Sequence, residues 1–162
     1  MVVGDGAANG VARKRVNGAA KGAEFERKLA DYFVSLGYTD ARRMIRTGTV
    51  KHADEGDLDG LPFVVQAKTQ AESATDLQIT RWRAETYRQQ IARQLTIGLL
   101  VVKRNGRADI GMSWVHLDVA ELANIFGAYW TGIEPIRRAS RAVTRCALRD
   151  LAPALLLRYP PK

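Results

Sequence analysis

Apolar residues recur at helical spacing near the start of the chain. The stripe that they form consists of Phe25, Leu29, Tyr32, Phe33 and Leu36. This period predicts an amphipathic helix from Lys21 to Leu36, and Gly37 directly after it supplies a C-terminal stop. It is the clearest helical segment of the sequence.

Short strand-like segments and one long helical segment follow. The strands are expected at Asp40 to Arg46, Leu58 to Lys68, Ile97 to Lys103 and Gly111 to Leu117. A turn near Gly60-Leu61-Pro62 breaks the second strand segment, and Asn105-Gly106 is a hairpin signal before the last strand. The run Phe63-Val64-Val65 indicates a strand buried on both faces. Thr47 to Gly56 is expected to be a polar loop. Thr75 to Leu95 is expected to be an amphipathic helix, with Leu77, Trp82, Tyr87 and Ile91 as its apolar residues.

The pattern weakens after Asp118. Val119 to Phe126 is expected to be a short helix, and Ile136 to Leu157 a basic amphipathic helix. The arginines of the second segment are Arg137, Arg138, Arg141, Arg145 and Arg149. Such a helix can grip nucleic acid, dock on a partner or pack with a solvated face. The order of elements predicts an α/β fold, with a mixed sheet flanked by helices and a basic helical C-terminal extension.

The length and composition suit one globular domain. The chain has 162 residues, of which 46% are hydrophobic. It contains no apolar run of the roughly 18 residues that a membrane span needs, so an intracellular, cytoplasmic protein without a membrane partner is expected. The single cysteine, Cys146, cannot form an internal disulfide, and His52 and His116 lack zinc-site spacing. We interpret Cys146 as a small residue on a helix face.

The net charge of +8 is concentrated at the two ends of the chain. Residues 1–28 carry a net +3, residues 29–135 a net −1 and residues 136–162 a net +6. Residues 1–18 lack periodicity and are expected to form a flexible arm carrying Arg13, Lys14 and Arg15. Basic arms attract polyanions, nucleic acid first and anionic membranes second, because neutralised phosphates release counterions. The alternative is that the arginines of the two ends simply keep a small protein soluble.

Candidate chemistry lies on the segment around the predicted strand from Leu58 to Lys68. Asp57 can hold a hard cation through its carboxylate, and the side-chain oxygen of Gln66 is a weaker ligand. Lys68, two residues further along the strand, points the same way as Gln66. A Mg²⁺ ion beside a lysine suits the stabilisation of charge on a phosphate under attack.

Helical geometry distinguishes the two acids of the first helix. Glu26 lies about 80° from the centre of the apolar stripe, and Glu24 lies about 120° away on the other side. Glu26 therefore borders the core, where a carboxylate needs a partner, either an arginine or a metal ion. A surface glutamate paired with Arg27 or Lys28 is the simpler alternative.

The helix and the strand together carry a family resemblance. Lys21-Gly22-Ala23-Glu24-Phe25-Glu26-Arg27-Lys28-Leu29 resembles the Lys-Gly-x-x-x-Glu-Arg-x-Leu opening of the archaeal-type Holliday junction resolvases, which belong to the PD-(D/E)XK, or restriction-endonuclease-like, nuclease superfamily. Further matching pieces follow in order: Gly37-Tyr38, Arg46-Thr47-Gly48, Asp57 and Gln66-Ala67-Lys68. The resemblance covers residues 21–103, within an expected nuclease core over residues 19–118, and explains nothing in the extension over residues 119–162.

The resemblance implies a role for each matched position. Glu26, Asp57, the side chain of Gln66 and the backbone carbonyl of Ala67 would surround one or two Mg²⁺ ions, which Mn²⁺ can replace. Lys68 would orient the attacking water or stabilise the charged phosphate. Gln66 departs from the family acid, and nearby Asp54, Glu55 or especially Asp59 could compensate.

DNA contacts are expected along the basic arms and in the loop before the strand. The residues concerned are Arg13, Lys14, Arg15, Lys21, Arg46, Thr47, Arg137, Arg138 and Arg141. Either Thr47 or Thr49 matches the hydroxyl that the family places near the scissile phosphate.

The leading hypothesis is a Mg²⁺-dependent, structure-selective DNA endonuclease. The resemblance implies a homodimeric Holliday junction resolvase whose partner is branched DNA. Another nuclease of the superfamily is the nearest alternative. A catalytically silent DNA-binding module, in which Gln66 marks a lost metal site, is a second. An interaction protein that docks an acidic partner through its arginine-rich tail is a third.

Overall fold

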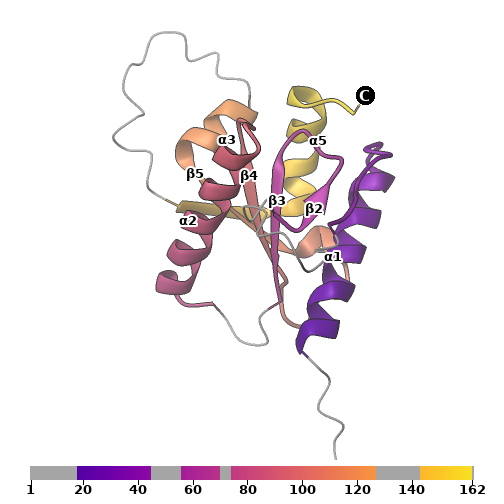
Figure 1. The fold of residues 1–162 in the computed structure, drawn as a ribbon, viewed down its shortest axis with the longest axis vertical. Coiled ribbons are helices and arrows are strands. Elements are labelled where there is room, and N and C mark those ends of the chain that lie inside the picture. Colours follow the sequence, from indigo (N-terminus) through magenta and orange to yellow (C-terminus); the bar gives the residue numbers. More distant parts are fainter. Residues whose placement is uncertain (1–17, 45–55, 70–73, 127–142, 162) are drawn as a thin grey trace, which may run out of the picture.

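A mixed four-stranded sheet forms the centre of the molecule, between two layers of helices (Figure 1). The computed structural model describes residues 18–44, 56–69, 74–126 and 143–161. The strands of this sheet, in spatial order, are β3 (Val64–Lys68), β4 (Gly98–Val102), β5 (Trp114–Asp118) and β6 (Val143–Ala147). β3 and β4 are parallel, whereas β5 and β6 each run antiparallel to the strand before them. The predicted α/β class and mixed sheet are confirmed.

The first helix and the short hairpin after it follow the sequence pattern closely. α1 (Gly18–Ser35) confirms the predicted first helix. The expected strand from Asp40 to Arg46 is reduced to β1 (Arg42–Arg43), which pairs antiparallel with β2 (Leu58–Asp59). Gly60 ends this hairpin with a φ of +76°, and a Cβ there would lie 1.9 Å from the carbonyl oxygen of Asp40. Only glycine fits this turn, which explains the break between β2 and β3.

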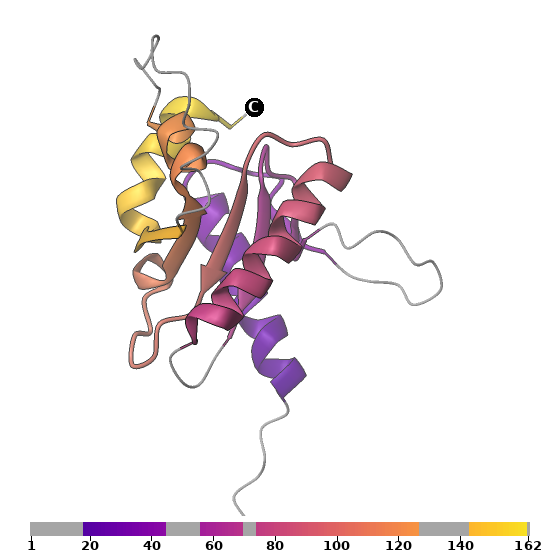
Figure 2. The same ribbon diagram turned by 90° about the vertical axis from the view of Figure 1, so that its left-hand side faces the viewer.

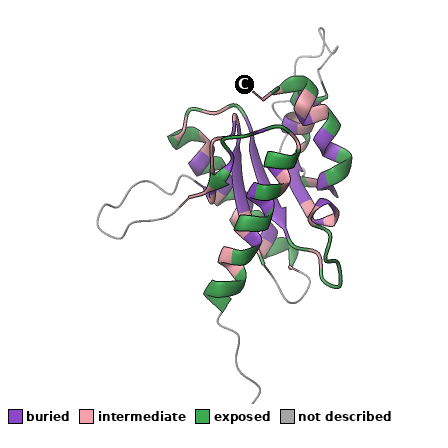
Figure 3. Ribbon diagram, turned by 90° about the vertical axis from the view of Figure 1, so that its right-hand side faces the viewer, coloured by how far each residue is buried: buried purple, intermediate pink, exposed green. Residues whose placement is uncertain are grey.

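The main hydrophobic core lies on the sheet face covered by α1 and α5 (Leu148–Arg158). Its strands appear as buried backbone in Figure 3, with exposed residues on the outer sides of the helices. Phe33 and Leu151 from the helices and Val65, Leu99 and Leu117 from the strands are at most 1% exposed. The odd-numbered positions of β3, β4 and β5 thus form one continuous apolar layer.

α2 (Asp76–Ala92) covers part of the opposite face, crossing in front of the strands in Figure 2. A capping box between Thr75 and Gln78 fixes its start. The predicted helix is confirmed, but its expected apolar side is wrong at three of four residues: Leu77, Tyr87 and Ile91 are exposed, whereas Trp82 is half-buried against the sheet. The residues that α2 buries against the sheet are Ile79, Arg83, Thr86 and Gln89. α2 therefore presents a largely polar face to the strands, and this face lies beside the candidate site.

Arg83 fastens α2 to the neighbouring elements. Its Nη1 donates to the carbonyl oxygen of Gly98 over 2.7 Å, and Nη2 pairs with Glu121 and lies 3.4 Å from Asp118. Burial raises the pKa of Glu121, although Arg83 opposes this shift. The charge of Arg83 is therefore paired with carboxylates inside the fold and does not add to the positive charge of the surface.

The C-terminal prediction is wrong in one element. α3 (Val119–Ile125) confirms the short helix, but residues 143–147 form the strand β6 where one helix from Ile136 to Leu157 was expected. Cys146 accordingly lies on a strand, where burial raises its pKa. β-branched Val143 and Thr144 favour a strand, and alternation places Arg145 and Cys146 on opposite faces of the sheet. The expected strand from Gly111 begins only at Trp114, after a 3₁₀ turn over Ile110–Met112.

Candidate active site

Asp57 lies at the edge of β3 that does not face β4. Its backbone N–H donates to the carbonyl of Val65 over 2.9 Å, and its Oδ2 accepts from the N–H of Ala67 over 2.7 Å. Val64 and Lys68 bond to the side of β4, so Ala67 directs both its N–H and its carbonyl to the opposite edge, where its N–H meets Asp57. The carboxylate of Asp57 and the carbonyl of Ala67 therefore share one strand edge.

Gln66 and Lys68 project from the face of β3 that lies against α2, on the opposite side of the sheet from the main core. Gln66 is 2% exposed. Its Nε2 donates to Glu85 over 2.9 Å, and its Oε1 accepts from the hydroxyl of Thr86 over 2.7 Å. Nζ of Lys68 lies 3.3 Å from the same oxygen of Glu85. One carboxylate on α2 thus holds both polar side chains of the strand end.

Sequence reasoning missed Glu85. The apolar side of α2 was expected from Leu77, Trp82, Tyr87 and Ile91, which leaves Glu85 among the charges of a helix surface. A signal existed in β3, because an amide and an ammonium two residues apart on a buried strand face need an acceptor nearby. The helix that crosses this face is the element that can supply it.

Glu26 occupies the border position that helical geometry predicts. Its side chain is 18% exposed and pairs with Arg43, while the exposed Glu24 pairs with Lys28 at 2.7 Å. Of the two partners expected for Glu26, the structure thus provides an arginine. The next residue of this segment, Met44, donates its N–H to the carbonyl of Asp57 over 2.9 Å. The hairpin therefore connects Glu26 to the edge where Asp57 lies.

The donor chemistry at this edge fits a hard divalent cation held by few protein atoms. Mg²⁺ is commonly bound by one or two carboxylates, with water and substrate phosphates completing its shell. The carboxylate of Asp57 and the carbonyl of Ala67 meet that description. Asp59 is committed elsewhere, to Arg42 and, at 3.2 Å, to Arg93. Among the residues that the structure describes, no three acidic, histidine or cysteine side chains form a metal-binding group.

A cationic cavity of about 760 Å³ lies beside the end of β3. Thr69, directly after Lys68, lines it. Its charged lining residues are Lys21, Glu24, Lys28, Lys103, Arg104 and Arg107. Five cations against one carboxylate favour a phosphate backbone over a neutral ligand.

The remaining expected DNA contacts lie outside the described residues. They are Arg13, Lys14, Arg15, Arg46, Thr47, Arg137, Arg138 and Arg141, and the same holds for Thr49, Asp54 and Glu55. Lys21 is described, and its exposed side chain on α1 faces the cationic cavity.

Comparison with known proteins identifies no relative of this chain. No family model matches it, and searches of curated proteins and of solved structures find no match. The structure itself shows an α/β protein with carboxylate and lysine side chains at the end of β3. Within the described ranges, no helix is long and apolar enough to cross a membrane.

Proposed function

We propose that this protein is a Mg²⁺-dependent, structure-selective DNA endonuclease of the restriction-endonuclease-like fold, acting as a Holliday junction resolvase. The observation that carries the proposal is that Asp57 accepts a hydrogen bond from the N–H of Ala67 at the edge of β3, while the next residue, Lys68, pairs with Glu85. Asp57 presents a carboxylate at the edge of β3, next to Ala67. Lys68, the residue after Ala67, presents a cation at the same strand end. This pairing suits attack on a phosphodiester.

The order of elements supports the same proposal. A helix, a hairpin, a strand, a crossover helix and a parallel strand follow one another in the region that resembles the resolvases. α1 brings Glu26 to the hairpin, and β3 carries the Gln66-Ala67-Lys68 strand end.

Each residue has a distinct part in the proposed chemistry. A bound Mg²⁺ would supply positive charge for the phosphate and acidify a water molecule. Asp57 and Ala67 are the residues that would hold it. Lys68 offsets negative charge that develops on the phosphate, and Glu85 fixes the position of its ammonium group. The cationic cavity binds the neighbouring phosphates of the strand.

The proposed assembly is a homodimer on branched DNA. A four-way junction presents two equivalent strands, so a twofold protein can place one site at each. The protein would then make paired, symmetric nicks.

A catalytically silent DNA-binding module is the second candidate. The observation that favours it is Gln66, whose amide is engaged at both ends by Glu85 and Thr86. Calorimetry with Mg²⁺ or Mn²⁺ separates the candidates, because a silent module has no metal binding that depends on Asp57.

Cleavage of labelled DNA by Asp57→Asn tests the proposed function. The substrates are a four-way junction, a replication fork and a plain duplex, each incubated with Mg²⁺. We expect symmetric nicks on the junction, with the cleavage rate reduced at least about a hundredfold in the variant and junction binding retained. Asp31→Asn, which removes an exposed acid of α1, is the matched control. Equal cleavage by Asp57→Asn would refute the site assignment.

A further inference from the structure

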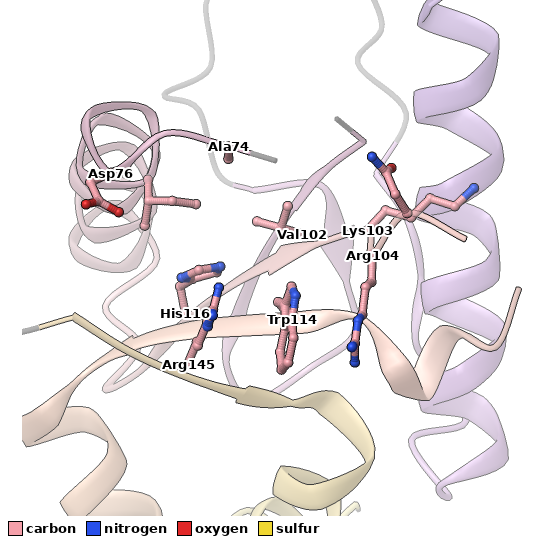
Figure 4. A pocket seen from close by; sticks show the side chains of 10 residues that line it. Ala74, Asp76, Val102, Lys103, Arg104, Trp114, His116 and Arg145 are labelled. Carbon is pink, nitrogen blue, oxygen red and sulfur yellow. The ribbon is translucent and has the colours of Figure 1, made fainter. Parts of the chain in front are cut away.

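A second cavity lies on the sheet face that α2 leaves open, and it is built around Trp114 of β5 (Figure 4). Its volume is about 290 Å³. The guanidinium carbons of Arg104 and Arg145 lie 4.4 Å and 4.9 Å from the centre of the indole ring. Ile79 and Val102 provide apolar lining between α2 and the strands. We call this the Trp114 cavity.

Strand register connects the Trp114 cavity to the candidate active site. Lys68 is opposite Val102, and Val102 is opposite Trp114, so the three residues form one row across β3, β4 and β5. Paired residues of neighbouring strands project from the same face. Two strand spacings place Trp114 about 10 Å from Lys68. A nucleic-acid strand bound at Lys68 therefore has the cavity within reach.

The rim of the cavity is positively charged. Lys103, Arg104 and Arg145 line it, against the single carboxylate of Asp76. Within the described part of the chain, none of these three cations forms an ion pair. Stacking on Trp114 orders the two guanidinium groups, so less conformational entropy is lost when they bind an anion.

His116 adds a polar group without adding charge. It is 8% exposed and lies opposite Arg145 in the sheet. Burial, followed by the neighbouring charges of Arg145 and Arg83, lowers the pKa of His116 to about 4. The ring is therefore neutral at pH 7, when it can both donate and accept a hydrogen bond.

We propose that the Trp114 cavity binds one nucleotide of an unpaired DNA strand. The base enters the space lined by Ile79, Val102 and Trp114, and its phosphate binds Arg104 and Arg145. A cavity of this size is at the lower limit for small-ligand pockets and suits one base. Proteins that bind single strands combine a basic groove with aromatic side chains, and here Trp114 takes part by holding the two guanidinium groups of the rim over its ring.

The identity of the ligand rests on the proposed function, because DNA is the substrate that brings a nucleotide to this face. A base inside a duplex is stacked and paired, so entering the cavity would cost its unstacking. An unpaired nucleotide next to a branch does not carry that cost. The Trp114 cavity thus supplies a physical basis for structure selectivity.

Fluorescence anisotropy with the full-length protein tests the inference. The probes are a labelled single-stranded oligonucleotide and a blunt duplex of the same sequence, in EDTA and at one fixed salt concentration. Trp114→Leu and Arg145→Ala are each expected to weaken single-strand binding about tenfold and duplex binding much less. Phe126→Leu and Arg158→Ala, which alter an exposed aromatic residue and an exposed arginine elsewhere, should leave both affinities unchanged.

Two results would overturn the inference. One is equal loss of single-strand and duplex affinity in both cavity variants, and the other is no loss beyond that of the controls. Arg145 is exposed, so its variant keeps the test valid if Trp114→Leu fails to fold. Because metal is absent, cleavage does not enter the measurement. Single-strand binding through Trp114 without any nuclease activity in Mg²⁺ would support the inference and refute the proposed function.

Discussion

Gln66 determines the electrostatics of the candidate site at the scale of single residues. A strand-end acid would add a negative charge next to Lys68, whereas the amide of Gln66 adds none. The nearby carboxylate comes instead from Glu85 on α2, which contacts both side chains. The resolvase-like pattern has an acid at the position of Gln66 on β3. In this protein the corresponding negative charge lies on α2, at Glu85.

This arrangement predicts that Glu85→Gln impairs cleavage. Removing the carboxylate releases the ammonium group of Lys68, and we expect the cleavage rate to fall about 10- to 100-fold. The control is Asp150→Asn, which breaks an exposed carboxylate–arginine pair on α5, away from the site and the cationic cavity. Junction cleavage and thermal midpoints should be measured together.

A double variant distinguishes a chemical role of Glu85 from a structural one. Gln66→Glu combined with Glu85→Gln returns the acid to the strand while keeping the amide–carboxylate contact. Partial recovery of cleavage is expected. If Glu85→Gln alone cleaves DNA as fast as the wild type, at equal stability, that result would contradict a role for Glu85.

The sequence predicts the position of a site residue where the helical period of its own element determines which way the side chain points. The angle around α1 correctly separates Glu26 from Glu24, because both angles refer to one apolar stripe. Glu85 could not be placed in the same way. The face that α2 turns to the sheet depends on the strand beneath it, and its buried residues include Arg83, Thr86 and Gln89.

At the scale of elements, the same contrast explains β6. Arginines three and four residues apart suggested a helix over this segment, but hydrogen bonding to β5 selects a strand for residues 143–147. The strand that β6 pairs with, β5, lies about 30 residues earlier in the chain, so the spacing of residues within 143–147 cannot reveal the pairing. Strand geometry also turns Arg145 toward Trp114, at the cavity proposed to bind a nucleotide.

The outer side of α2 predicts the dimer surface. Leu77, Tyr87 and Ile91 are exposed and fall within about 80° of one another around the helix. Exposed apolar residues gathered on one face are typical of interaction sites. If the proposed homodimer forms there, changing both Tyr87 and Ile91 to Lys should weaken it at least about thirtyfold. Sedimentation velocity measures the change.

A matched control for the dimer surface lies on α5. Leu157 is 87% exposed, more than any of the three α2 residues. Leu157→Lys should leave the association unchanged. If it dissociates the dimer while the α2 variant does not, the interface lies on the other side of the sheet.

At the scale of the whole molecule, the charge is unevenly distributed. The middle of the chain, residues 29–135, is nearly neutral, and the excess of cations belongs to the two ends. The described fold nevertheless gathers Lys21, Lys28, Lys103, Arg104 and Arg107 around one cavity. The proposed DNA binding would therefore have two separable electrostatic sources, the cationic cavity next to the site and the terminal segments.

Deletion of residues 1–17 isolates one of these sources. The deleted segment contains Arg13, Lys14 and Arg15, and α1 begins directly after it. Each phosphate contact contributes about 0.9 to the slope of log affinity against log salt concentration, so losing three lowers the slope by about 2 to 3. Replacing three exposed arginines of the fold, Arg81, Arg88 and Arg158, by Ala removes the same charge as a control. Equal slopes for the deletion and the wild type would place the DNA contacts outside residues 1–17, because counterion release counts only phosphates that the protein neutralises.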